Sequence, residues 1–538
     1  MTLTLICAAA VVILGLLLSR FSSRAGIPVL LGFILLGMVF GSDGLLKIPF
    51  ENFDFANQIC SVALIFIIFY GGFGMSWRRA KPVMVPAVLL STLGVVLTAG
   101  IMALFCRFAL GMDWLDSLLV GSILSSTDAA SVFSILRAKR LNLRFGTASL
   151  LEMESGSNDP AAYTLTILVL SLMRGGVSSG EMVWMAFSQV AFGLLCGAGL
   201  AVGSVWFFRR LKNPEAGVGT LLIFAIALLS YALPTLIGGN GYLSTYLVGV
   251  VLGHQNCIPE KKAAVHFMDG VTSLMQMALF FLLGLLSFPS LMPRVLPMAV
   301  GITLFLTLVA RPAVVFLLLL RRPEGRSRLS CLRQKLLISW AGLRGATSIV
   351  FAIMAVIDPA SISVDIFHIA FCVVLLSIGV QGSLLPWAAR RLSMIDTEAD
   401  IMRTFNDYSS DTPIQFIRLH ITPEHPWQGK TIMELALPPD LQVAMVLRGE
   451  AKVIPRGNTL LQPGDLLILT TLAYEENRPF SIIESEVEPD GSWQGRTLAD
   501  IDWGNALVVL VRREGKMLIP TGRLRLKAGD QLVLASGD

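Results

Sequence analysis

The sequence predicts an all-α polytopic membrane domain followed by a small α/β region. Of the 538 residues, 54% are hydrophobic and 15% are charged, and the mean hydropathy is +0.71. Apolar runs of about 18 residues or more, long enough to cross a bilayer, recur up to Arg391. Short alternating runs typical of strands begin near Ile414. We therefore expect a transmembrane domain over 1–391, a linker over 392–413 and a soluble region over 414–538.

Hydropathy divides the membrane part into thirteen expected spans. They cover residues 3–20, 26–41, 57–74, 82–106, 114–136, 147–173, 181–208, 218–237, 241–256, 267–288, 295–320, 334–357 and 366–388. The first lacks a basic leading segment and a convincing cleavage site, which favours a retained helix over a signal peptide. Basic residues concentrate in every second connection, which predicts an outer N-terminus, a cytoplasmic C-terminal region and an odd number of spans.

Two compositional features exclude other classes of protein. The formal net charge of +5 lies mostly in short loops between apolar segments, where it orients helices, so we expect no nucleic-acid binding. The seven cysteines lie in the hydrophobic part without the spacing of metal ligands, and they are expected to behave as small apolar residues.

The sixth expected span, 147–173, carries Glu154, Asn158 and Asp159 in its interior. On insertion scales, placing one carboxylate at the centre of a membrane helix costs roughly 2.5 to 3.5 kcal/mol of free energy. Such residues therefore usually belong to a site or a pathway. The alternative is that they only hold helices together. Ser155 and Asp159 share one helical face, and Glu154 and Asn158 share the neighbouring face. One polar stripe could bind an ion while the other contacts an adjacent helix.

The fifth and twelfth spans each contain a polar segment that weakens a helix. Residues 125–128 read Ser-Ser-Thr-Asp, and Arg344 stands between Gly342 and Gly345. Glycine and short polar side chains both disfavour helix interiors, so we expect unwinding there. If spans 1 to 6 and 8 to 13 are inverted repeats, these segments correspond, which is typical of transporters with broken helices around a midplane site. Close packing of small residues would leave Asp128 and Arg344 unexplained.

Three motifs together resemble one family. ESGSND in the sixth span, TD in the fifth and GLRGA in the twelfth are similar to the monovalent cation:proton antiporter-1 family of the NhaP type. The resemblance implies that Asp159 alternately carries the cation and the proton, and that Asn158 supports it. In this family an Asn-Asp pair is associated with electroneutral exchange, so the resemblance implies electroneutral exchange here. Ala129, where a proline often follows TD, and the C-terminal region together resemble the potassium/proton subgroup, with sodium as the alternative cation.

The resemblance also assigns the surrounding residues. It implies that Ser155, Asp128 and Thr127 complete the ion site, and that Glu154 pairs with Arg344 as a structural ion pair. It further implies a homodimer in the lipid of a prokaryotic plasma membrane, which is the inner membrane in a Gram-negative cell. The expected role is in potassium and pH homeostasis, and the protein is not expected to be an enzyme.

The soluble region contains a repeat. WQGKTIMELALPP from Trp427 is echoed by WQGRTLADIDWGN from Trp493, at a period of about 65 residues. We expect two small α/β units over 414–476 and 477–538, each with a helix after WQG and a hairpin. The signature from Pro455 resembles tandem C-terminal subdomains of regulators of potassium conductance, also called RCK_C or TrkA-C-like subdomains. No dinucleotide-binding fold accompanies them, so we expect no tightly bound cofactor, while a regulatory cyclic dinucleotide or nucleotide stays open.

Other functions fit the sequence less well. A secondary antiporter needs no Walker motif, and none is present. The main alternative is a cation channel gated by the tail, which is the part of the chain after Arg391. Such a channel predicts a filter of the TVGYG type, which the sequence lacks. An intramembrane protease would need a GxGD pair or a serine with a membrane histidine, and neither is evident.

Overall fold

The computed structural model describes residues 9, 11–15, 17, 29–75, 77–139, 141–211, 217–255, 257–258, 261–320, 327–396, 414–422, 424–435, 437, 441–448, 451–472, 480–487, 493–501, 503, 506–513, 516–518 and 520–537. The chain divides into two compact units, Met1–Ser409 and Ser410–Asp538, which are described separately. Most of the first expected span, 3–20, and residues 397–413 of the expected linker lie outside the described residues.

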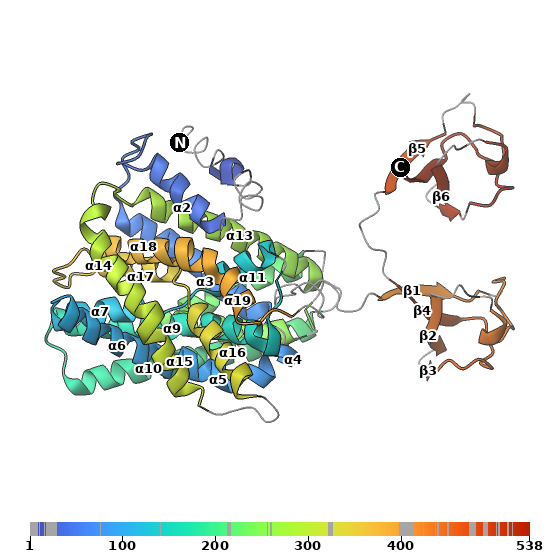
Figure 1. The fold of residues 1–538 in the computed structure, drawn as a ribbon. Helices are drawn as coiled ribbons and strands as arrows, with labels where there is room; N and C mark the ends of the chain where they lie inside the picture. Colours follow the sequence, from blue (N-terminus) through green and yellow to red (C-terminus); the bar gives the residue numbers. More distant parts are fainter. Residues whose placement is uncertain are drawn as a thin grey trace. The chain divides into compact units, whose positions relative to one another are not determined.

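The first unit is built from helices (Figure 1). The α-helices are α2 (Val29–Phe40), α3 (Phe53–Phe73), α4 (Trp77–Ala80), α5 (Met84–Ser91), α6 (Leu93–Ala109), α7 (Trp114–Ile123), α8 (Ala129–Ala138), α9 (Thr147–Arg174), α10 (Ser179–Arg210), α11 (Val218–Leu236), α12 (Gly241–His254), α13 (Lys261–Leu285), α14 (Met292–Phe305), α15 (Arg311–Leu318), α16 (Arg328–Trp340), α17 (Ala346–Ile357), α18 (Ile366–Leu376) and α19 (Ser383–Arg391). Short 3-10 helices cover Lys81–Val83 and Arg144–Gly146, and π-helices cover Leu306–Ala310 and Ser377–Gly382.

Seven helices among the described residues are long and apolar enough to cross a membrane. They cover Phe53–Phe73, Lys81–Ala109, Ser179–Arg210, Val218–Leu236, Lys261–Leu285, Met292–Leu318 and Ile366–Arg391. Three shorter apolar helices, α2, α7 and α17, accompany them. The prediction of a helical membrane domain is confirmed, and the count of thirteen spans stays a prediction.

Within the described part of the membrane unit, the fifth and twelfth expected spans are each interrupted by a break. One separates α7 from α8 over 124–128, and the other separates α16 from α17 over 341–345. The breaks touch, because the N–H of Asp128 donates to the carbonyl of Leu343 at 2.8 Å. Gly345 permits this approach, since a Cβ there would lie 2.3 Å from the Cβ of Asp128. The unwinding predicted in the fifth and twelfth spans is therefore confirmed.

Helix α9 lies inside the membrane unit, where it contacts α5, α7, α12 and α17 (Figure 1). It runs as one helix of 28 residues even though Pro160 lies within it. Proline has no N–H, so the carbonyl of Gly156 loses its helical partner. The Asn240 side chain, at the start of α12, donates to the carbonyl of Pro160 at 2.8 Å and fixes the neighbouring helix at this point.

The second unit contains two four-stranded antiparallel sheets. The first joins β1 (Ile414–His420), β2 (Leu441–Arg448), β3 (Ala451–Val453) and β4 (Asp465–Leu472) in the order β1-β4-β2-β3. The second joins β5 (Phe480–Glu486), β6 (Ala506–Arg513), β7 (Lys516–Leu518) and β8 (Gln531–Gly537) in the order β5-β8-β6-β7. Each sheet buries its own small apolar cluster, so each repeat has its own core.

The helix expected after each WQG motif is not formed. The described residues of this unit contain only single 3-10 turns there, Ile432–Glu434 and Leu498–Asp500. In the first repeat, a capping box between Thr431 and Glu434 starts the turn. Pro438 and Pro439 then follow in the sequence and cannot continue a helix. The α/β prediction for this region is therefore wrong in its helical part.

Candidate cation site

Asp159 lies at the meeting point of α9 and the two helix breaks. Its side chain is 7% exposed. The Ser126 hydroxyl, from the first break, donates to its Oδ1 in a short hydrogen bond. The Thr347 hydroxyl, at the start of α17, lies 3.3 Å from its Oδ2. The described partners of this buried carboxylate are thus neutral hydroxyl groups.

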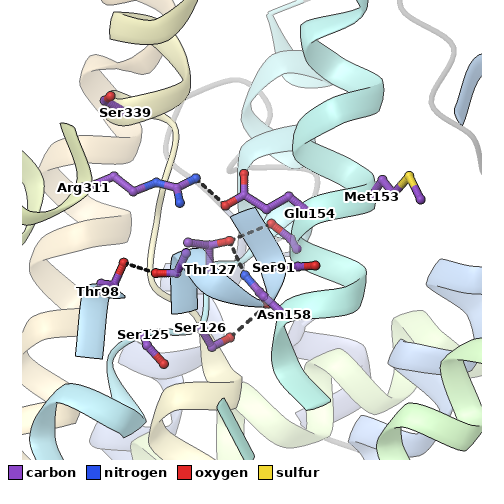
Figure 2. A network of polar contacts seen from close by, with 12 residues as sticks. Ser91, Thr98, Ser125, Ser126, Thr127, Met153, Glu154, Asn158, Arg311 and Ser339 are labelled. Atoms are coloured by element: carbon purple, nitrogen blue, oxygen red, sulfur yellow. Dashed lines mark hydrogen bonds and ion pairs between the residues drawn. The ribbon is translucent and has the colours of Figure 1, made fainter. Parts of the chain in front are cut away.

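A chain of hydrogen bonds joins the other predicted residues beside Asp159. Figure 2 shows the Asn158 amide donating to Thr127 Oγ1 at 2.6 Å. The Thr127 hydroxyl in turn lies 3.0 Å from Ser155 Oγ. Ser126 Oγ is 3.5 Å from Asn158 Oδ1. The structure thus brings Asn158, Thr127 and Ser155 together in one network.

The Asp128 side chain has a structural contact as well as a place in the site. One carboxylate oxygen accepts from the N–H of Ala130 at 2.9 Å, and the other accepts a short hydrogen bond from the Ser131 hydroxyl. Asp128 therefore caps the N-terminus of α8, where a negative charge is favoured. No basic side chain contacts it among the described residues, so its charge is also available to a bound cation.

A cavity of about 490 Å³ connects these groups. Four carboxylates line it, those of Asp128, Glu152, Asp159 and Asp269. No lysine, arginine or histidine is among its described lining residues. Ser155, Thr127 and Thr347 add hydroxyl groups. A cavity with this lining attracts cations and repels anions.

The predicted ion pair between Glu154 and Arg344 is wrong. Glu154 Oε1 lies 2.6 Å from Arg311 Nη2, and both side chains are buried (Figure 2). The contact brings two charges together without good hydrogen-bond alignment. Arg344 instead donates through Nη1 to the carbonyls of Ser125 and Ser126, at 2.7 and 2.6 Å.

Arg344 and Arg311 bind different partners because they lie at different helix ends. Arg344 lies in the second break, next to carbonyls of the first break that have no helical partner, and it satisfies them. Arg311 is the first residue of α15, after a π-helical turn. It is the only charged residue of the eleventh expected span, 295–320. A charge that stands alone in an apolar span needs a partner, and this feature of the sequence indicates Arg311 as a candidate partner of Glu154.

Two contacts of Asp159 are absent from the predicted site. Ser126 belongs to the polar cluster of the fifth span, from which the family resemblance assigns its neighbour Thr127 to the site. Thr347 follows the GLRGA motif directly. One hydroxyl comes from the first break and the other from the start of α17, directly after the second break, and both meet the carboxylate of Asp159. The sequence does not show which spans are in contact, so it gives no means of choosing among adjacent hydroxyl residues.

These features define a membrane transporter for cations, and comparison with known proteins gives its family. The family described as sodium/hydrogen exchanger, transmembrane, matches residues 8–391. The chain belongs to this family, whose members are transporters and not enzymes. The TrkA-C domain matches residues 416–473 and 482–537, one match for each sheet.

Several proteins of known name are similar to this chain. The chain is 34% identical over 462 residues to the K(+)/H(+) antiporter NhaP2 of Shewanella baltica, covering 84% of this chain and 78% of that protein. It is 32% identical over 478 residues to the K(+)/H(+) antiporter NhaP of Alkalimonas amylolytica, covering 88% and 82%. Its fold resembles the sodium proton antiporter MjNhaP1 of Methanocaldococcus jannaschii, with a TM-score of 0.63 and 24% identity over 73% of this chain and 99% of that chain.

Proposed function

We propose that the chain is a secondary antiporter that exchanges a monovalent cation for protons. The observation that carries the proposal is the setting of Asp159, a buried carboxylate on the wall of an acid-lined cavity whose described partners are hydroxyl groups. A carboxylate fixed by an arginine would be neutralised permanently. This one can accept a cation or a proton in turn.

Competition for Asp159 couples the two fluxes. An ionised carboxylate attracts a cation, and the hydroxyls of Ser126 and Thr347 can rotate to offer it their lone pairs. A proton on the carboxylate removes the charge and with it the attraction. If only the loaded forms carry the site from one side of the membrane to the other, each cation that moves one way is exchanged for one proton moving the other way.

The neighbouring residues have distinct roles in this proposal. Ser155 and Thr127 supply oxygen ligands, including the Thr127 backbone, and Asn158 orients them through its bond to Thr127. Asp128 adds a second negative charge without being the proton carrier. Because Asn158 contributes no titratable charge beside Asp159, we propose electroneutral exchange. A transport rate that depends strongly on imposed membrane potential would contradict that stoichiometry.

Potassium is the proposed cation, with sodium as the alternative. The support is the identity of 32 to 34% with proteins named K(+)/H(+) antiporters. Purified protein in liposomes, loaded with a pH-sensitive dye, should collapse a pH gradient when potassium is added. Asp159→Asn should abolish this flux, and Asp54→Asn, which removes an exposed carboxylate at the start of α3, should not. Flux in Asp159→Asn equal to the parent would overturn the assignment.

The proposed arrangement in the membrane follows from the sequence. We place thirteen spans, 1 to 6 and 8 to 13 being inverted repeats, in a prokaryotic plasma membrane with the C-terminal region in the cytoplasm. The basic connections support this orientation. We also propose a homodimer. Cysteine accessibility to an impermeant reagent on either face of whole cells tests the orientation, and mass photometry in nanodiscs tests the dimer.

We propose that the tail regulates exchange without carrying it. The domain division at 391, the linker 392–413 and the two units 414–476 and 477–538 belong to this proposal, and a cyclic dinucleotide or a nucleotide is the proposed kind of effector. Truncation after Arg391 should leave coupled exchange intact but insensitive to such compounds. A folded but inactive truncated protein under every condition would show that the tail is part of the transport machinery.

A further inference from the structure

A polar stripe on α13 forms part of the cavity wall. Asp269, Thr272, Ser273 and Gln276 all line the cavity that contains Asp159. Their spacing of three, four and seven residues from Asp269 places them on one face of the helix. The rest of α13 beyond them is strongly apolar, reading MALFFLLGL to its end. A stripe of this kind in a membrane helix indicates a water-filled or ion-filled path.

Asp269 brings a carboxylate to this wall. Its Oδ1 accepts a hydrogen bond from the Tyr70 hydroxyl on α3 at 2.9 Å. The bond orients the carboxylate without neutralising it, because the phenol is an uncharged donor. No basic residue is among the described residues that line the cavity. The negative charge of Asp269 therefore faces the same space as that of Asp159.

Thr272 gives an independent indication of a ligand. Its side chain is only 5% exposed, and its hydroxyl has no hydrogen-bond partner in the described part of the chain. Leaving a buried hydroxyl unpaired is unfavourable, so a partner outside the chain is expected. The hydroxyl lies about one helical turn from Asp269, on the same face of α13.

We propose that Asp269 and Thr272, with Ser273 and Gln276, form a second cation site on the path to Asp159. This site, called the outer site because it lies farther from the centre of the exchange reaction and not because of the side of the membrane, holds a partly hydrated monovalent cation before it reaches Asp159. The proposal rests on the proposed function and adds a step to it. Asp269 lies eight residues after Lys261, the first residue of α13, or about 12 Å along the helix. Lys261 lies between the ninth and tenth expected spans, 241–256 and 267–288, and an outer N-terminus places the connection after an odd-numbered span in the cytoplasm. The outer site therefore serves cations that arrive from the cytoplasm.

The kinetic consequence is specific. A carboxylate on the approach path raises the local cation concentration, but it does not take part in the exchange step itself. Asp269→Asn should therefore raise KM for the cytoplasmic cation about threefold, which is the scale of one exposed charge reduced by salt. The maximal rate should stay unchanged. Asp269→Glu should restore KM, and Thr272→Val should raise it without lowering thermal stability, because the hydroxyl it removes has no protein partner.

The experiment measures KM for potassium with the full chain. It compares everted membrane vesicles, which expose the cytoplasmic face, with right-side-out vesicles. Asp54→Asn is the matched control on α3. An unchanged KM in Asp269→Asn, with normal exchange by the parent protein, overturns the outer site but leaves the proposed function intact. No exchange by the parent protein overturns the proposed function instead. If Asp269→Asn does not fold, an unchanged KM in Thr272→Val overturns the outer site.

Discussion

The two units treat their buried carboxylates in different ways. In the tail, Asp465 and Asp530 are fully buried, and each is bound by an arginine through both oxygens. Arg448 contacts Asp465 at 2.8 Å twice, and Arg513 contacts Asp530 at 2.7 Å twice. In the membrane unit, Asp159 is buried to a similar degree but receives only hydroxyl donors among its described partners. The first arrangement fixes a charge permanently, and the second leaves it available for exchange.

Burial in a membrane is not the cause of this difference. Glu154 lies five residues before Asp159 on the same helix, and it has an arginine partner, Arg311. One helix therefore carries both kinds of carboxylate. The comparison predicts that mutations of the paired acids lower stability, whereas mutations of the unpaired acids lower transport.

The largest expected effect on stability is at the buried pair. Glu154→Gln leaves the Arg311 charge without a partner, which typically costs about 3 to 5 kcal/mol. Thermal unfolding in detergent, followed by tryptophan fluorescence, should show a clear loss of Tm. Arg311→Met combined with Glu154→Gln should recover part of it. Asp159→Asn, the matched control on the same helix, should keep or raise Tm because it strands no charge.

Two results would break this part of the comparison. Additive losses in the double-mutant cycle would show that Glu154 and Arg311 do not act as a pair. Recovery of Glu154→Gln by Arg344→Met instead would restore the pairing first expected from the sequence.

A smaller loss of stability is expected in the tail. The Arg448 side chain holds the pKa of Asp465 below its usual range. A carboxyl whose pKa is lowered by folding stabilises the protein above its unfolded pKa of about 3.9, and the contribution disappears as pH falls through the lower folded value. Asp465→Asn should therefore cost about 1.5 to 3 kcal/mol at pH 7, toward the lower end because Arg448 is 36% exposed.

Hydrogen exchange of the full chain resolves this loss by region. Asp465→Asn should speed exchange in β2 and β4, with no change of exchange in α9. Asp530→Asn, the equivalent change in the second repeat, should do the same in β6 and β8. The difference between mutant and parent should shrink below about pH 4. A difference that persists at that pH would mean that the ion pair is not its source.

At Asp128 we expect an effect on transport that is smaller in free energy than either loss of stability. The amide oxygen of an asparagine can still accept from the Ala130 N–H, and its NH2 group can donate to the Ser131 hydroxyl, so Asp128→Asn should fold normally. The loss of one negative charge near the cation should raise KM about fivefold. Because Asp128 lies beside Asp159, the rise should appear from both sides of the membrane, unlike that of Asp269→Asn. Unchanged KM would remove Asp128 from the ion site.

The sequence predicted features that depend on local chemistry. The breaks at 124–128 and 341–345 follow from short polar residues and glycines, which disfavour helix wherever they lie. The partner of Glu154 could not be predicted in the same way, because Arg311 and Arg344 both lie in apolar spans and only packing decides which one reaches it. The error in the tail has the opposite cause. Pro438 and Pro439 argue locally against a helix, but the repeat pattern favoured one.

The central claim is that one carboxylate, Asp159, is shared by the cation and the proton. The most direct test is the pH profile of exchange in liposomes at several potassium concentrations. If the two ligands compete, the rate lost at low pH should return when potassium is raised. The acid limb should shift toward acid by about one pH unit for each tenfold rise in potassium once its concentration is well above its Kd. An acid limb that does not move with potassium would mean that protons act at a separate group and would contradict the claim.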